Sequence, residues 1–190
     1  MDDRIARGVN FIYAKEYVVL RHGEEGWARV LGRLSAEAAG VWRSTLVLTG
    51  TYSFAAFKAL AGALPAEAGG KSDENLARMY EFIADRSLST IYKVFFRLAS
   101  PSFVVNNYPR LWARFFTTGT VAVRGAGTGT AIVEFTLPAI FLDWLPAACL
   151  GYSTKAVTMA GGRALSMAEV SRVKRPDGEW AISYQLRWRE

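Results

Sequence analysis

One histidine and one cysteine are the only residues of their types in the 190-residue sequence, and they limit its chemistry. His22 lies in "RHGEEGW" and Cys149 lies in an apolar run. A single cysteine excludes an intramolecular disulfide and a zinc site made of several thiolates. Because Gly23 is expected to end a helix, the imidazole of His22 can contact the last carbonyl groups of that helix. We therefore expect His22 to be a helix cap, not a metal ligand or a base.

Nucleophilic catalysis would need a serine or cysteine next to a base. The segment "GYSTK" lacks the second glycine of the Gly-x-Ser-x-Gly turn, because Lys155 stands in its place. The apolar surroundings of Cys149 are typical of a packed, unreactive thiol. No two carboxylates have a spacing that identifies an acid and a base. We therefore expect no catalytic residues and no enzymatic activity.

Two glycine-bearing segments invite comparison with phosphate-binding loops. "AGGKS" has the Gly-Lys-Ser end of a nucleotide-binding loop, but Pro65 stands where that motif requires its first glycine. "RGAGTGT" lies between two predicted strands and not at the start of a helix, where phosphate would gain from the helix dipole. We interpret both segments as surface turns.

The composition is typical of a globular chain, with 51% apolar and 21% charged residues. Its length suits one domain spanning residues 1–190. The net charge of +6 favours a solvated basic surface over a nucleic-acid site. We expect no membrane span, because the apolar run "AIFLDWLPAACLGY" is interrupted by Asp143 and Pro146 and is shorter than the ~20 residues that a bilayer requires. The acidic start "MDDR" predicts no secretory signal, and the lone cysteine suits the cytoplasm.

Hydrophobic periodicity predicts helices first and strands later. Apolar spacings of three and four predict helices over 3–21, 24–35, 54–65 and 108–116, and a longer helix from a cap at Ser72 and Asn75 through residue 99. Hairpins are predicted over 119–137 and 163–189, with a helix over 141–161 that Asp143 caps. This order predicts an α+β fold, in which the mainly helical part (1–118) packs on a C-terminal antiparallel sheet of about four strands with one crossing helix (119–190, ββαββ).

Three segments carry resemblances to known families. "GVNFIYAKEYVVLRHGEEGWARVL" resembles the N-terminal helices of haem-dependent nitric-oxide/oxygen-binding domains, and "IYKVFFRLASPSFVVNNYPRLWARFFTTG" is similar to a myxobacterial family of paralogous proteins of unknown function. "CLGYSTKAVTMAGGRALSMAEVSRVKRPDGEWAISYQLRW" resembles the end of 4-vinyl-reductase domains, whose superfamily includes the TRAPP-like subunits of the Golgi transport complex. Together these resemblances imply the shared α+β fold, with a pocket between helices and sheet.

The resemblance also implies what a cofactor site would contain. Haem domains of this type use a histidine from a mid-chain helix and a Tyr-x-Ser-x-Arg triad that holds the propionates. No histidine follows His22, and "YSTK" around Ser153 is the nearest counterpart of the triad. The zinc-binding relatives use cysteines near the last hairpin, where Val173, Asp177 and Ala181 stand. We therefore expect neither haem nor zinc.

The function that these observations favour is a non-enzymatic sensory or regulatory domain of the bacterial cytoplasm that binds a hydrophobic small molecule. Aromatic residues line ligand pockets as well as cores. We expect the pocket to be lined by Tyr80, Tyr92, Phe96, Phe103, Trp112, Phe116 and Trp144. Two alternatives stay open: a protein-interaction or dimerisation module without a ligand, and a haem-based gas sensor with unorthodox ligation through His22 or a tyrosine.

Overall fold

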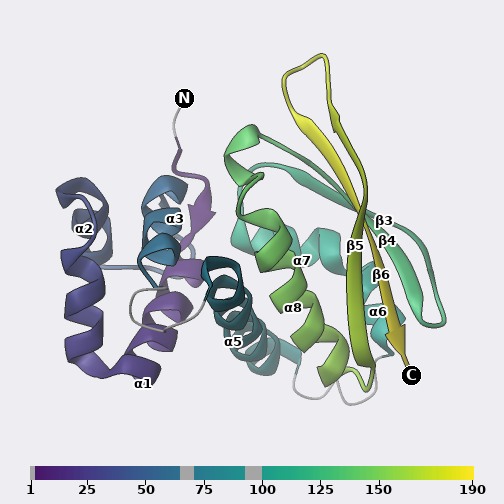
Figure 1. Cartoon of the computed structure of the whole chain (residues 1–190), viewed down its shortest axis with the longest axis horizontal. Helices are drawn as coiled ribbons and strands as arrows, with labels where there is room; N and C mark the ends of the chain where they lie inside the picture. The colour runs from purple at the N-terminus through teal and green to yellow at the C-terminus, as the bar shows by residue number, and fades with distance from the viewer. Residues whose placement is uncertain (1–2, 65–70, 93–99) are drawn as a thin grey trace.

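The computed structural model describes residues 3–64, 71–92 and 100–190, except for the side chains of residues 90–92. Apart from α8, its helices come first along the chain, and a four-stranded antiparallel sheet that α8 divides into two hairpins comes last, which confirms the predicted α+β class (Figure 1). The helices are α1 (Gly8–Gly32), α2 (Ala36–Arg43), α3 (Phe54–Ala63), α5 (Ser72–Tyr92), α6 (Pro101–Asn106), α7 (Tyr108–Phe115) and α8 (Leu145–Met159). That the chain forms a single domain stays a prediction.

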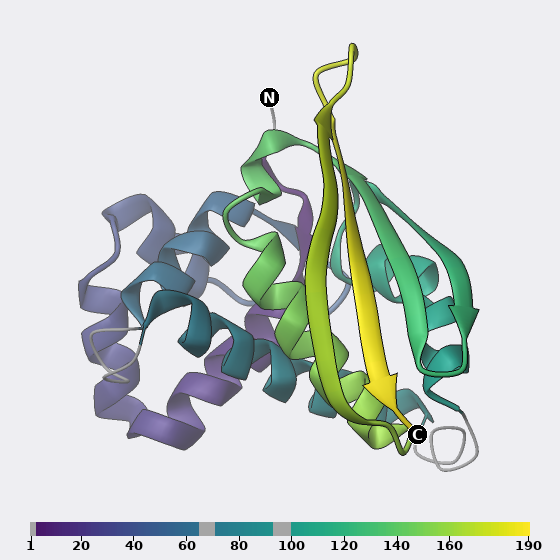
Figure 2. The ribbon, with the colours of Figure 1, turned by 45° about the vertical axis from the view of Figure 1, so that its right-hand side comes forward.

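The sheet has the order β3-β4-β6-β5, and all neighbouring strands are antiparallel. The strands are β3 (Thr120–Gly127), β4 (Thr130–Leu137), β5 (Arg163–Lys174) and β6 (Trp180–Arg189). Alternate residues of β4 and β6 are buried, as expected for strands with one face on the core. Cross-strand neighbours on that face include Val133 with Tyr184 and Phe135 with Ile182. The tip of the β5–β6 hairpin extends beyond the rest of the molecule (Figure 2).

Helix α8 crosses between the two hairpins and packs between the sheet and α5 (Figure 1). Gly151 of α8 allows this close packing, because a Cβ at that position would collide with the backbone of Ala77 in α5. Helices α6 and α7 contact β3. Helices α1, α2 and α3 lie at the end of the molecule opposite the sheet.

The first two predicted helices are the two helical segments of α1, which meet at a kink. Gly23 interrupts α1 with a φ of 69° and a ψ of −179°, so the predicted break at this residue is confirmed. A left-handed φ of this kind favours glycine. His22 directly precedes the kink, and its Cβ occupies the space that a side chain at position 26 would need, which explains Gly26. The capping role of His22 stays a prediction.

Asp143 does not cap α8, so that prediction was wrong. Helix α8 begins at Leu145 after Trp144, and the Asp143 carboxylate instead accepts two hydrogen bonds from Lys58 of α3, at 2.5 and 2.7 Å. Lys58 also donates to the carbonyl of Ile140 at 3.1 Å. A carboxylate gains more from an ammonium group than from a neutral backbone amide, and a partner 85 residues away cannot be read from local sequence.

Several other local predictions also differ from the structure. Asn75 lies inside α5 and is buried, so it is not a cap. The long helix is described only to Tyr92, and its predicted remainder lies outside the described residues. Helix α2, helix α6, the 3-10 turn η1 (Ala139–Phe141) and the short strands β1 (Ala6–Arg7) and β2 (Thr51–Tyr52) were not predicted.

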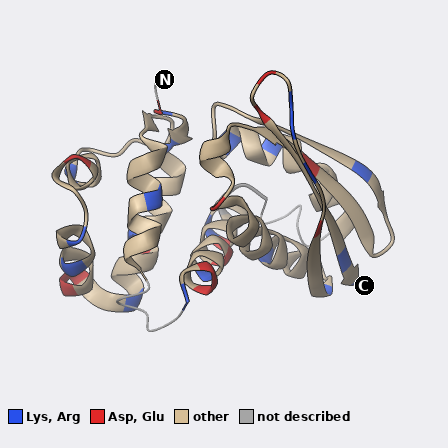
Figure 3. Cartoon of the chain, turned by 45° about the horizontal axis from the view of Figure 1, so that its top comes forward, with Lys and Arg blue, Asp and Glu red and all other residues tan. Residues whose placement is uncertain are grey.

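Basic and acidic side chains are interspersed over the helices and along the β5–β6 hairpin (Figure 3). Ion pairs join several of them, including Arg86 with Glu16, Lys155 with Asp85 and Arg124 with Glu134. Within residues 3–64, 71–92 and 100–190, no helix combines the length and apolarity that crossing a membrane requires.

Candidate functional site

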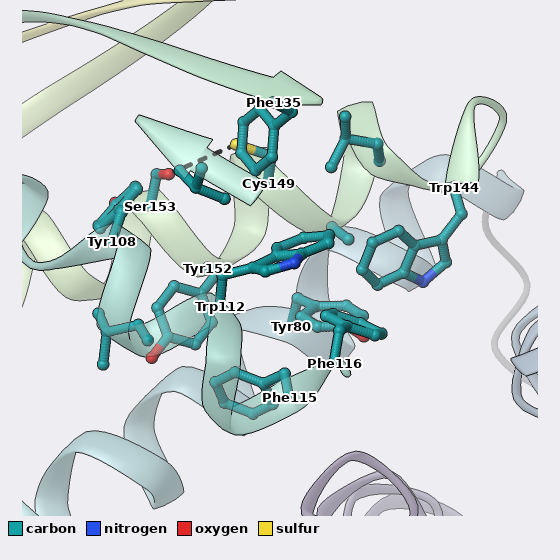
Figure 4. A pocket seen from close by; sticks show the side chains of 14 residues that line it. Tyr80, Tyr108, Trp112, Phe115, Phe116, Phe135, Trp144, Cys149, Tyr152 and Ser153 are labelled. Atoms are coloured by element: carbon teal, nitrogen blue, oxygen red, sulfur yellow. Dashed lines mark hydrogen bonds between the residues drawn. The ribbon is translucent and has the colours of Figure 1, made fainter. Parts of the chain in front are cut away.

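A cavity lies between the sheet and the helices α5, α7 and α8 (Figure 4). Helix α7 contributes one face, with Tyr108, Leu111, Trp112 and Phe115, and Phe116 follows directly. Helix α8 contributes another, with Leu145, Ala148, Cys149, Tyr152 and Ser153, and Trp144 precedes it. Tyr80 of α5, Val121 of β3 and Phe135 of β4 complete the wall. Segments from all three helices and the sheet therefore enclose one site.

The helical period explains why these residues meet. Positions 108, 111, 112 and 115 follow the i, i+3, i+4, i+7 spacing that places residues on one face of a helix, and positions 145, 148, 149 and 152 repeat it. Both faces are apolar and turn toward the buried side of the sheet. The cavity wall is therefore almost entirely hydrocarbon.

Aromatic rings hold the cavity wall together. Trp112 and Phe116 have ring centroids 4.5 Å apart, and Phe116 meets Trp144 edge to face at 5.3 Å. Trp144 meets Tyr80 edge to face at 5.1 Å. The volume that remains in the cavity is about 60 Å³. One water molecule needs roughly 10–15 Å³ of such a cavity, so several water-sized groups fit. The cavity therefore has room for a small ring without rearrangement.

Three polar side chains gather at one end of the cavity, away from Trp144 (Figure 4). Cys149 Sγ lies 3.9 Å from the hydroxyl of Ser153, one helical turn further along α8. The buried hydroxyl of Tyr108 makes no hydrogen bond of ordinary geometry. Burial raises the pKa of Cys149 to about 12 and also raises the pKa of Tyr108, while the nearby Ser153 hydroxyl partly opposes both shifts. At neutral pH the thiol and the phenol are therefore protonated.

Four of the seven residues expected in the pocket line this cavity: Tyr80, Trp112, Phe116 and Trp144. Phe103 does not, because it lies on the outward face of α6 with 54% of its surface exposed. Phe96 and the side chain of Tyr92 lie outside the described residues. Tyr108, Phe115, Phe135 and Tyr152 also line the cavity and were not predicted to do so, and Cys149, which was predicted only to pack, lines it as well. A role in ligand binding stays a prediction for all of them.

The chain's only histidine, His22, lies on α1 and does not line the cavity. Within the described part of the chain, no three His, Cys, Asp or Glu side chains come close enough together to hold a metal ion. Among the described residues that line the cavity, the thiol of Cys149 and the phenols of Tyr80, Tyr108 and Tyr152 are the side chains that could ligate a metal after losing a proton.

The helices and the antiparallel sheet that enclose the aromatic cavity form an α+β fold. Comparison with solved structures shows that this fold is the one found in H-NOX domains. No protein-family model and no curated protein matches the chain. A mutant H-NOX protein of T. tengcongensis is 10% identical, with a TM-score of 0.69 over 97% of this chain and 98% of that one. The Fe(II) unliganded H-NOX protein of K. algicida is 16% identical, with a TM-score of 0.68 over 97% of both chains.

A third similar structure comes from work on haem redox potential and porphyrin distortion, with 10% identity and a TM-score of 0.70 over 95% of this chain and 99% of that one. These neighbours overturn our expectation that haem is unlikely. That expectation relied on the missing histidine and the missing triad, whereas the fold that encloses the cavity is one that haem proteins share. The resemblance to the haem-dependent domains is supported at the level of the fold.

Proposed function

We propose that the chain is a sensor domain that binds a small molecule in the aromatic cavity. One observation carries the proposal: side chains from α5, α7, α8 and the sheet close around a single, almost entirely hydrocarbon cavity. Ligand sites are typically concave and apolar with a few polar groups that fix orientation, and Tyr108, Cys149 and Ser153 are such groups here. No catalytic step is part of the proposal.

Haem is the ligand that the structural neighbours favour, which makes a haem-based gas sensor the first form of this proposal. The donor types fit, because cysteine thiolate and tyrosine phenolate both serve as axial ligands of haem iron. Cys149 or Tyr108 would hold the iron, and the iron would supply the site for a diatomic gas. The present volume is too small, so rings such as Trp112 and Phe116 would have to move aside.

Haem titration tests this form. We expect a Soret band that saturates at one haem per chain, and weaker binding of haem as pH falls, because either donor must lose a proton to bind iron. Cys149→Ala and Tyr108→Phe identify the donor: the responsible variant should lose the band's position or most of the affinity, and the other should not. If haem added to the apoprotein shows no saturable spectral change, this form is wrong.

An apolar ligand without iron is the second form, and the size and lining of the cavity favour it. A cavity volume of about 60 Å³ has room for roughly four to six water-sized groups. Apolar cavities of this kind stay dry and bind small rings such as benzene. We expect toluene to raise the thermal midpoint of unfolding and Ala148→Leu, which fills the cavity, to abolish that shift. Extraction of the purified protein followed by mass spectrometry would reveal a natural occupant.

A protein partner or a second copy of the chain is a further prediction. Val170 and Val173 are more than half exposed on β5, which is an edge strand of the sheet. Exposed edges and apolar side chains are features of strand-to-strand association. Sedimentation velocity over a hundredfold range of concentration tests this: a dimer should appear and should weaken on Val173→Lys.

A further inference from the structure

A groove opens on the surface between α1, α2 and the loop that follows α2. Figure 1 shows these two helices at the end of the molecule opposite the sheet, so the groove is separate from the aromatic cavity. Its volume is about 510 Å³, compared with about 60 Å³ for the aromatic cavity. The groove is therefore large enough for an extended molecule and is open to solvent.

The floor of the groove is apolar. Ile12, Trp27, Leu31, Trp42 and Leu46 form it. Trp27 and Trp42 pack edge to face with ring centroids 5.6 Å apart, and both are nearly fully buried. The indole nitrogen of Trp42 donates to the carbonyl of Ala56 at 3.0 Å and is not free to bind a ligand. Because both indoles are nearly fully buried, the half-buried side chains of Ile12, Leu31 and Leu46 supply most of the apolar surface of the floor.

The rim of the groove is cationic. Lys15 and Arg43 line it, and both side chains are exposed. The ammonium group of Lys15 lies 5.6 Å from the ring centroid of Trp27, which keeps this charge next to the floor. In the part of the chain that the structure describes, no carboxylate lines the groove. An anion at the rim would therefore meet two positive charges and no negative one.

We propose that this groove binds a free anionic amphiphile, a molecule with one alkyl chain and one carboxylate or similar head group. The apolar floor removes the chain from water, which is favourable in proportion to the area covered. Lys15 and Arg43 attract the head group by charge-assisted hydrogen bonds. A free molecule fits this site better than a membrane surface does, because the apolar residues lie at the bottom of a hollow and the flat surface of a bilayer cannot enter it.

Dodecanoate below its micellar concentration is the probe, and Trp27 and Trp42 supply a fluorescence signal at the site itself. We expect saturable binding of one dodecanoate per chain, weakened by salt. Lys15→Gln and Arg43→Gln together should weaken it about tenfold, since each exposed charge pair contributes modestly. The pair Arg163→Gln and Lys174→Gln on β5 is the matched control: it also removes two exposed positive charges, far from the groove, and should leave the affinity unchanged.

Dodecyltrimethylammonium separates charge recognition from simple hydrophobic adsorption. It should bind at least tenfold more weakly than dodecanoate, and the double variant should reduce that preference. Equal binding of the two surfactants, or equal losses in the Lys15/Arg43 variant and in the Arg163/Lys174 control, would overturn the proposal. Binding to phosphatidylglycerol vesicles without binding to dodecanoate would also overturn it, in favour of a membrane surface. Because Lys15 and Arg43 are exposed, these variants are expected to fold.

Discussion

The hydroxyl of Tyr80 donates a hydrogen bond to the side-chain oxygen of Asn10, with 3.2 Å between the two oxygens. The amide nitrogen of Asn10 donates in turn to the carbonyl of Phe115 at 2.8 Å. Asn10 is fully buried on α1, and Tyr80 lines the cavity from α5. A single side chain thus joins α1, α5 and the end of α7 behind the cavity wall.

Replacement of Asn10 by alanine should be costly, because it removes the hydrogen bond to the Phe115 carbonyl and leaves the buried Tyr80 hydroxyl without the acceptor it has in Asn10. Each such group costs roughly 1–3 kcal/mol, so we expect Asn10→Ala to lower the free energy of unfolding by about 2–4 kcal/mol. Urea denaturation measures the loss. Tyr80→Phe removes one of these bonds only and should cost less. The double variant should lose less than the sum of the two single losses, and strict additivity would show that the two side chains are not coupled.

Gly151 and Gly40 should respond in opposite ways to the same substitution. Gly151 faces the backbone of Ala77, so Gly151→Ala forces α5 and α8 apart and should cost at least ~2 kcal/mol. Gly40 of α2 has nothing within 4 Å of an added Cβ, and Gly40→Ala should raise stability by up to ~1 kcal/mol through its better helix propensity. Thermal unfolding followed by circular dichroism compares them. A Gly151→Ala protein as stable as the parent would contradict the close helix packing.

The fold could be predicted from sequence where one local period dominates. The β-branched runs on either side of "RGAGTGT" and the Pro-Asp-Gly turn before Glu179 predicted the two hairpins, and Gly23 predicted the break in α1. Prediction failed at Asp143 because a tertiary contact decides there: its carboxylate pairs with Lys58, which is far away in the sequence. Helix α6 was missed although its start has a local cause. Ser100 accepts a hydrogen bond from the amide of Phe103 at 3.2 Å, and Pro101 occupies the first helical position.

The site was predicted only in part, because aromatic density does not show which way a side chain points. Phe103 belongs to the same aromatic segment as Trp112, yet it points outward from a short helix. Spacing was the better signal: Tyr108, Leu111 and Phe115 lie on the same face of α7 as Trp112. Val121 and Phe135 enter the wall through the sheet, and nothing in the sequence of the helices indicates that contact.

Cys149 should be nearly inert in the folded protein. Burial raises the pKa of its thiol to about 12, and the thiolate is the reactive form, so iodoacetamide at pH 8 should alkylate it far more slowly in the native protein than in urea. Mass spectrometry follows the alkylation. Equal rates with and without urea would contradict the burial of the thiol.

The raised pKa of Cys149 should also make stability depend on pH in the alkaline range. Since the pKa of the thiol in the folded protein lies above the ordinary value of 9.0, the native state loses stability as pH rises above 9.0. The Cys149→Ala variant should not share that loss.

The ion pair between Glu169 and Arg172 on β5 should make stability depend on pH in the acid range. Two hydrogen bonds of 2.8 and 2.7 Å from Arg172 hold the pKa of the Glu169 carboxyl below its ordinary value of 4.5. The folded pKa is therefore lower than the unfolded one, so the contribution is complete above pH 4.5 and is lost as pH falls through the folded pKa. Both side chains are 34% exposed, which limits the contribution to about 1 kcal/mol or less.

Urea denaturation of Glu169→Gln and the parent at several pH values tests this ion pair. We expect the variant to be less stable at pH 7 by up to ~1 kcal/mol and the difference to shrink toward zero in acid, because protonated glutamate no longer attracts the guanidinium. Glu24→Gln on α1 makes the same change in net charge and controls for the overall charge of the molecule. If the Glu169→Gln difference stayed constant from pH 7 into acid, it would reflect lost packing on β5 and not the charge of the carboxylate.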